Sequence, residues 1–265
     1  VVRHQSIRWT WSELGQRVDD LAAGLLSLGL ERGDRIGIWS PNRYEWTLTQ
    51  FATAKAGLVL VNVNPAYRRA ELEYAMNKVE CKALVLAPAL KTSNYLEIVS
   101  DLVRDKKLPH LKHIVRLGTE KTPGMLNFDD VAKAGANKER AYLSDLAPKL
   151  QFDDAINIQF TSGTTSFPKG VMLTHDNVIR DAWAAAARIG IRDDDRYFNC
   201  RPFFHVGGST MSALMSLVFG ATLVTLPTFE AGAALAMLEQ EECTLISGND
   251  TIFHRFHCCP SSTFA

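Results

Sequence analysis

Apolar residues along the chain follow two spacings that alternate. A spacing of three or four residues predicts helices, and short apolar runs bounded by Gly, Pro or Asn predict strands. The first helix is expected to begin after Thr10 and to end at Gly29, because Thr10 and Glu13 have the spacing of a capping box. Further helices are expected before Gly57, after Asn177 and over residues 71–79, 95–102, 210–219 and 233–241. Strands are expected over residues 36–39, 59–63, 83–86, 113–117, 156–160, 171–173, 222–226 and 244–246.

This alternation is typical of βαβ units, in which helices connect parallel strands. It predicts an α/β fold built of layered, mostly parallel sheets with helices on both faces. A polar stretch over residues 118–150 interrupts the alternation and is the best candidate for an internal boundary. We therefore predict a first subdomain over residues 1–150, a second, incomplete part over 151–253 and an irregular tail over 254–265.

The longest apolar stretch runs from Pro202 to Phe229, and its only ionisable side chain is His205. A helix that spans a membrane needs about 20 apolar residues in one unbroken run. This stretch instead contains Gly207, Gly208 and Gly220 and then changes to β-branched residues. It predicts a buried helix, a glycine turn and a buried strand, and no membrane span is expected.

Composition excludes several classes of protein. The 29 Lys and Arg residues balance 29 Asp and Glu residues, whereas binding to nucleic acid requires an excess of positive charge. The five cysteines are scattered and include no CxxC pair, so neither a disulfide framework nor a zinc site is indicated. The acidic run 193–195 lies between two arginines and is expected to be a solvated turn, so no metal ligand is predicted.

The segment between the predicted strands 156–160 and 171–173 is rich in groups that bind phosphate. It combines hydroxyl side chains, two glycines and Lys169 within a few residues. Backbone N–H groups, small residues, hydroxyls and a cation are what a polyphosphate-binding loop needs. The segment lacks the GxxxxGK[ST] spacing of a P-loop, and Ser, Thr and Gly are also common in ordinary surface turns. From composition alone, a phosphate loop and a surface turn fit equally well.

The identity of the residues favours the first alternative. The segment QFTSGTTSFPKGVMLTH resembles the phosphate-loop signature of the adenylate-forming superfamily, and GLERGDRIGIWSPN, NVNPAYRRAELEYAMNKVECKALVLAP and PFFHVGG resemble further blocks of fatty acyl-CoA synthetases. The resemblance covers about residues 1–250 and is strongest to the medium-chain acyl-CoA synthetase branch. It implies the fold of the large N-terminal, AMP-binding domain, present here as an N-terminal fragment without the C-terminal domain.

The resemblance also implies a reaction. A fatty acid would be activated by ATP to acyl-AMP and then transferred to CoA, with Mg²⁺ held by residues outside this chain. The residues expected to bind the ATP phosphates are Thr161, Ser162, Gly163, Thr164, Thr165, Lys169 and Gly170, of which Lys169 and Thr165 are the candidate catalytic residues. Those expected beside the acyl group are Phe204, His205, Gly207, Gly208 and Gly248. Without the motif around it, His205 would more often be a hydrogen-bonded core residue.

The sequence departs from the family pattern in three places. Ser166 replaces the usual glycine of the phosphate loop, residues 247–251 replace a motif like GVPT, and the tail that follows is unlike the family. The chain alone is therefore expected to be inactive. Two alternatives stay open: a non-catalytic remnant that binds phosphate or acyl groups, and a ligase for a non-fatty carboxylate. The expected location is the cytoplasm, or the mitochondrial matrix in a eukaryote, and the oligomeric state is open.

Overall fold

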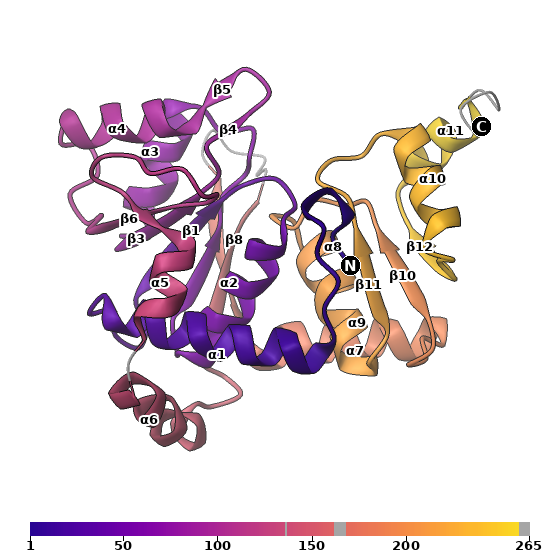
Figure 1. Cartoon of the computed structure of the whole chain (residues 1–265), viewed down its shortest axis with the longest axis horizontal. Coiled ribbons are helices and arrows are strands. Elements are labelled where there is room, and N and C mark those ends of the chain that lie inside the picture. The colour runs from indigo at the N-terminus through magenta and orange to yellow at the C-terminus, as the bar shows by residue number, and fades with distance from the viewer. Residues whose placement is uncertain (136, 162–167, 260–265) are drawn as a thin grey trace. The chain divides into compact units, whose positions relative to one another are not determined.

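A computed structural model describes residues 1–135, 137–161 and 168–259, which form two compact units (Figure 1). The larger unit contains Ser12–Pro41 and Glu45–Asp176, and the smaller one contains Val1–Trp11, Asn42–Tyr44 and Asn177–Ala265. The stretch 118–150 folds within the larger unit. The subdomain boundary predicted at residue 150 stays a prediction.

The larger unit is built on a seven-stranded sheet with the order β7-β6-β3-β1-β2-β8-β9. Neighbouring strands are parallel except for β8 and β9, which form an antiparallel pair at one edge. The strands are β1 (Arg35–Trp39), β2 (Val59–Asn62), β3 (Ala83–Leu86), β6 (His113–Arg116), β7 (Leu126–Asn127), β8 (Ala155–Thr161) and β9 (Lys169–Thr174). The predicted α/β class with a mostly parallel sheet is confirmed.

Helices alternate with these strands along the chain. They are α1 (Trp11–Ser27), α2 (Tyr44–Lys55), α3 (Arg69–Lys78), α4 (Tyr95–Arg104), α5 (Phe128–Ala134) and α6 (Asn137–Leu146), with the short 3-10 helix η2 (Ala147–Lys149) and a small hairpin of β4 (Ala89–Leu90) and β5 (Ser93–Asn94). The short 3-10 helix η1 (Arg3–Gln5) belongs to the smaller unit. Strands β2 and β3 are buried along their whole length. Such continuous apolar runs are what a strand covered on both faces requires.

The smaller unit has a three-stranded parallel sheet with the order β11-β10-β12. Its strands are β10 (Arg196–Asn199), β11 (Thr222–Thr225) and β12 (Leu245–Ser247). The helices are α7 (His175–Ile189, from Asn177 on in this unit), α8 (Val206–Gly208), the π-helix η3 (Ser209–Leu214), α9 (Met215–Phe219), α10 (Ala231–Gln240) and α11 (Asp250–His257). The central strand β10 was not predicted, because its two apolar residues lie between Arg196 and Asn199 and form no apolar run.

The prediction of an irregular tail from residue 254 is wrong for residues 254–257, which belong to α11. The helix begins where the Asn249 side chain accepts a hydrogen bond from the Ile252 N–H at 3.1 Å. Its apolar side is held by buried Ile252 and by Phe256, whose ring meets Phe229 edge to face at 5.4 Å. Capping and packing therefore form a helix that the spacing of apolar residues did not predict.

The apolar stretch from Pro202 to Phe229 folds as predicted into helix, glycine turn and strand. The helical run continues through α8, η3 and α9 to Gly220, whose φ of +75° reverses the chain before β11. None of the helices in the described residues is both long enough and apolar enough to cross a membrane.

Helices α1 and α5 approach each other closely at two glycines. A Cβ atom on Gly24 would lie 1.9 Å from the Val131 carbonyl oxygen, and a Cβ atom on Gly135 would lie 2.4 Å from Ala23 Cβ. Gly15, in the same helix α1, has no other atom within 4 Å of its Cβ position. Gly24 therefore allows helix packing, whereas Gly15 only lowers the helix propensity of α1.

We predict opposite effects of alanine at these two glycines. Gly24→Ala should lower the free energy of unfolding by about 3 kcal/mol, because the methyl group collides with backbone that cannot rotate away. Gly15→Ala should leave it unchanged or raise it by up to about 1 kcal/mol. Urea unfolding followed by circular dichroism measures both changes, and equal effects of the two substitutions would contradict the close contact.

One buried carboxylate ties the N-terminal segment to the start of β10 in the smaller unit. Glu241, whose side chain is 2% exposed, lies 2.8 Å from Arg8, 2.7 Å from Arg196 and 3.2 Å from Arg3. Burial by itself raises the pKa of Glu241, but the hydrogen bond from Arg8 and the charges of the three arginines together hold this pKa below its usual value of 4.5. The carboxylate therefore stabilises the folded state above that pH.

We predict that Glu241→Gln lowers the free energy of unfolding by about 2 kcal/mol at neutral pH, because the arginines lose their charged acceptor. The difference from the wild type should shrink as the pH falls below 4.5, where protonation removes the same charge from the wild type. Glu239→Gln is the control, because Glu239 is exposed and forms no ion pair within the described residues. Urea unfolding at a series of pH values gives the comparison; a difference independent of pH would contradict it.

Candidate functional site

The predicted phosphate loop lies at the tip of the β8–β9 hairpin in the larger unit. The antiparallel register pairs Phe160 with Gly170 and ends with the pair Thr161 and Lys169. Both flanking strands are therefore where the sequence predicted them. Of the predicted loop residues, Ser162, Gly163, Thr164, Thr165 and Ser166 lie outside the described residues.

Lys169 opens β9 with an exposed side chain that makes no ion pair with any acidic residue in the described part of the chain. Next to it, Gly170 packs tightly. A Cβ atom at Gly170 would lie 3.2 Å from Ile158 Cγ2 and 3.7 Å from Val79 Cγ1. Gly170 thus lets the hairpin lie close to the end of α3, and the described residues supply no acidic counter-ion to the ammonium group of Lys169 beside it.

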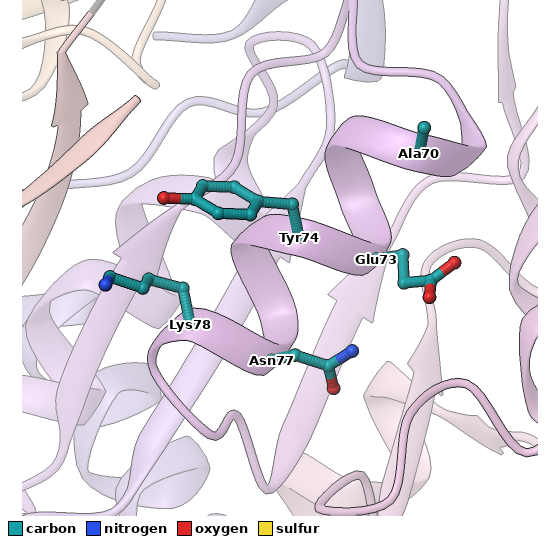
Figure 2. A pocket seen from close by; sticks show the side chains of 5 residues that line it. All are labelled: Ala70, Glu73, Tyr74, Asn77 and Lys78. Carbon is teal, nitrogen blue, oxygen red and sulfur yellow. The ribbon is translucent and has the colours of Figure 1, made fainter. Parts of the chain in front are cut away.

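Tyr74 of α3 is a residue that sequence reasoning missed. Its hydroxyl donates a hydrogen bond of 3.1 Å to the carbonyl oxygen of Pro168, the residue before Lys169. Tyr74 also lines a pocket of about 570 Å³ on α3, together with Ala70, Glu73, Asn77 and Lys78. Figure 2 shows these five side chains. Tyr74 and Pro168 are 94 positions apart in the sequence, so no local pattern could have connected them.

The second group of predicted residues lies at the carboxyl edge of the three-stranded sheet in the smaller unit. The register places Asn199 of β10 between Thr225 of β11 and Ser247 of β12. The hydroxyl groups of Tyr197 and Ser247 are hydrogen-bonded to each other. Gly248 and the segment 200–205 therefore leave neighbouring strands at the same edge, where ligands bind in open parallel sheets.

The segment that carries His205 is fixed by a second residue that sequence reasoning missed. The buried amide of Asn42 donates to the Arg201 carbonyl at 2.9 Å and accepts from the Phe203 N–H at 2.7 Å. Asn42 thus satisfies a backbone donor and a backbone acceptor of the segment, as a neighbouring strand would.

His205 caps the helical run that follows it. Its Nδ1 accepts a hydrogen bond of 3.0 Å from the Gly207 N–H, and its ring is exposed, so in the neutral ring the proton is on Nε2. The alternative that His205 is a core residue is therefore wrong. Phe204 beside it is half-buried. The result is a histidine with a fixed Nδ1 and an Nε2–H that faces solvent.

The predicted glycines of this region have packing roles. A Cβ atom on Gly208 would lie 2.3 Å from the Pro202 carbonyl oxygen, whereas one on Gly207 would lie 3.1 Å from His205 Nδ1. A Cβ atom on Gly248 would lie 2.9 Å from Ile252 Cγ2. Each glycine therefore allows a close approach between protein segments. Their predicted contact with substrate stays a prediction.

The two groups of residues belong to different compact units: the hairpin to the larger, and His205, Gly207, Gly208 and Gly248 to the smaller. The described residues contain no group of three or more His, Cys, Asp or Glu side chains that could hold a metal ion. In the acidic run 193–195, Asp195 accepts from the Thr244 hydroxyl at 2.7 Å and from the Arg192 N–H at 2.8 Å, as in a turn.

Comparison with protein families shows the family to which the chain belongs. The sequence profile of the AMP-binding enzymes matches residues 1–263, which is almost the whole chain. The chain belongs to the AMP-binding enzyme family. The resemblance to the adenylate-forming superfamily that the phosphate-loop signature indicated is thereby confirmed.

Two curated relatives of this AMP-binding chain are acyl-CoA enzymes. It is 40% identical over 261 residues to the mitochondrial medium-chain acyl-CoA ligase ACSF2 of Danio rerio, covering 93% of this chain and 43% of the relative. It is 34% identical over 260 residues to the putative acyl-CoA synthetase YngI of Bacillus subtilis, covering 94% of this chain and 47% of the relative. The predicted relation to the medium-chain branch is confirmed, and the chain spans less than half the length of these relatives.

Solved structures agree on the fold. The N-terminal domain of FACL13 from Mycobacterium tuberculosis superposes with a TM-score of 0.84 at 22% identity, over 98% of this chain and 61% of that one. At this identity the likeness concerns the fold alone.

The hydrogen bond to Nδ1 predicts the tautomer of His205. In protein labelled with ¹⁵N-histidine, the neutral ring should give the spectrum of an Nε2–H imidazole, because Nδ1 is occupied as an acceptor. A His205→Gln variant assigns the signal by its loss. A neutral ring with the proton on Nδ1 would contradict the capping geometry.

Proposed function

We propose that this chain forms the phosphate-binding and acyl-binding part of an ATP-dependent fatty acid–CoA ligase. The observation that carries the proposal is the family match over residues 1–263 together with 40% identity to a medium-chain acyl-CoA ligase. The reaction would join a fatty acid carboxylate to the α-phosphate of ATP, release pyrophosphate, and then exchange AMP for the thiol of CoA.

The hairpin of β8 and β9 supplies the phosphate side of the proposal. Lys169 presents an exposed ammonium group without a protein counter-ion in the described residues, directly opposite Thr161. A lysine is a compact point charge that suits phosphate oxygens, and the charge that develops on a leaving pyrophosphate would be stabilised there. We assign Lys169 this role, and Thr161, Ser162, Gly163, Thr164, Thr165 and Gly170 the surrounding phosphate contacts.

The edge of the smaller sheet supplies the acyl side. The Nε2–H of His205 is a donor that faces solvent, and Asn42 holds the segment on which it lies. A fixed donor of this kind suits the carboxylate of an acid that must approach ATP. We assign His205 to the carboxylate, with Phe204, Gly207, Gly208 and Gly248 as neighbours of the acyl group.

ATP and CoA are thus proposed as co-substrates. The described residues supply no cluster of ligands for Mg²⁺, so no step is assigned to that ion here. The zebrafish relative is named as mitochondrial, which supports the matrix as the location in a eukaryote.

The proposal predicts ATP–pyrophosphate exchange that depends on a carboxylic acid. Acids from acetate to palmitate are tested with the 265-residue chain, with benzoate and anthranilate to represent non-fatty acids. We expect ATP binding; because the departures from the family pattern predict little catalysis by the chain alone, any exchange that it supports should be largest with octanoate. Lys169→Ala should reduce that exchange by about 100-fold, because it removes a charge that stabilises the transition state.

Lys149→Ala is the matched control, because Lys149 is also exposed and lies outside the hairpin. It should leave exchange unchanged, and thermal melting of all variants shows whether they are folded. ATP binding without exchange would favour a non-catalytic phosphate-binding remnant. Exchange with anthranilate in place of octanoate would favour the non-fatty alternative, and full activity of Lys169→Ala would overturn the role of that residue.

A further inference from the structure

We propose that Tyr74 is a positioning residue for Lys169: its hydroxyl fixes the peptide group that joins Pro168 to Lys169. The inference rests on the proposed phosphate role of Lys169. The Tyr74 hydroxyl donates a hydrogen bond of 3.1 Å to the Pro168 carbonyl oxygen. The carbonyl and the backbone nitrogen of Lys169 belong to one planar peptide group, so holding the oxygen also sets the direction in which Lys169 begins.

Because the residue before Lys169 is a proline, the single hydrogen bond from Tyr74 is enough to restrain its backbone. A proline has no N–H group, and its ring holds φ near −65°. Its carbonyl is therefore the one backbone hydrogen-bonding group by which the residue before Lys169 can be anchored. With the ring restricting φ and Tyr74 holding the carbonyl, both dihedral angles of Pro168 are restrained.

The residue on the other side of Lys169 is also held against α3. A Cβ atom on Gly170 would lie 3.7 Å from Cγ1 of Val79, the residue that caps the end of α3. Helix α3 thus contacts the chain just before and just after Lys169, by a hydrogen bond at Pro168 and by packing at Gly170. Lys169 lies between these two anchors with its side chain exposed.

Helix α3 is itself a rigid base, because its buried face packs on the middle of the seven-stranded sheet. Leu72, Ala75 and Met76 are buried, and a Cβ atom on Gly37 of the central strand β1 would lie 3.2 Å from Met76 Sδ. A hydrogen bond also holds the helix: the Asn77 amide donates to the Lys107 carbonyl at 2.8 Å. The position of Tyr74 is therefore set by the sheet.

The side chains of α3 that contact the hairpin and those that contact Lys107 lie on two different sides of the helix. Figure 2 shows Tyr74 and Lys78 pointing to one side and Glu73 and Asn77 to the other. Glu73 and Asn77 both lie near Lys107, at 4.0 Å for the ion pair of Glu73. The side with Tyr74 is thus the one that meets the hairpin.

The experiment is a double-mutant cycle on the 265-residue chain, with ATP as the probe. Isothermal titration calorimetry measures the dissociation constant of ATP for the wild type, Tyr74→Phe, Lys169→Ala and the double variant. Tyr74→Phe keeps the ring and removes only the hydroxyl. We expect it to weaken ATP binding about 3- to 10-fold, the range of one net hydrogen bond. In the Lys169→Ala background it should have almost no effect, because Tyr74 acts through Lys169.

Tyr142→Phe is the matched control, because Tyr142 is 45% exposed and donates no hydrogen bond within the described residues. Hydrogen exchange of the backbone amides of 169–174 gives an independent measurement, and it should be faster in Tyr74→Phe only. Thermal melting confirms that each variant is folded. These three results together support the inference.

Two results would overturn it while leaving the proposed function intact. The first is ATP affinity in Tyr74→Phe equal to that of a wild type that does bind ATP. The second is an equal loss in both backgrounds, which would show a structural role independent of Lys169. A wild type that binds no ATP would instead overturn the proposed phosphate role, and the inference with it.

Discussion

The direction in which neighbouring strands pair is the constraint on which both candidate regions depend. Parallel strands must be joined by crossovers, and they bring their carboxyl ends to one edge of the sheet. In the smaller unit, β10, β11 and β12 therefore release the segments 200–205 and 226–230 and Gly248 at a common edge. In the seven-stranded sheet of the larger unit, β9 runs antiparallel to β8 and has the opposite effect. By turning back on β8, it holds both ends of the predicted phosphate loop, Thr161 and Lys169, face to face.

Side chains from distant parts of the sequence then fix the segments that follow or precede these strands. Asn42 bonds both ways to the backbone of the segment before His205, and Tyr74 bonds to the last carbonyl before Lys169. In both cases the partner is a backbone group that no strand satisfies. Such bonds restrain the backbone without occupying the exposed side chains, which stay available for ligands.

Features that depend on neighbouring residues in the sequence could be predicted, whereas those that depend on distant residues could not. Strand β3 was predicted to the residue, because its four residues are all apolar and all buried. Strand β10 was missed, because polar residues at both of its ends interrupt the apolar pattern. Arg196 forms an ion pair with Glu241, and the Asn199 side chain accepts a hydrogen bond from the Arg201 N–H in the loop after the strand. The candidate site residues were taken from the family motifs, and their roles stay predictions. Asn42 and Tyr74 were not found, since their roles depend on partners 159 and 94 positions away in the chain.

The distribution of cations adds a physical reason for the assignment of Lys169. No lysine follows Lys169 in the sequence, and the segments of the smaller unit contain none. Four arginines of that unit make fixed contacts: Arg3, Arg8 and Arg196 surround Glu241, and Arg201 donates to the Tyr197 hydroxyl at 3.1 Å. A guanidinium group suits such fixed, multiple bonds, whereas an ammonium group on a flexible stem can follow a phosphate that changes its charge and position during a reaction. Lys169 thus places a flexible ammonium group where the proposed chemistry needs one.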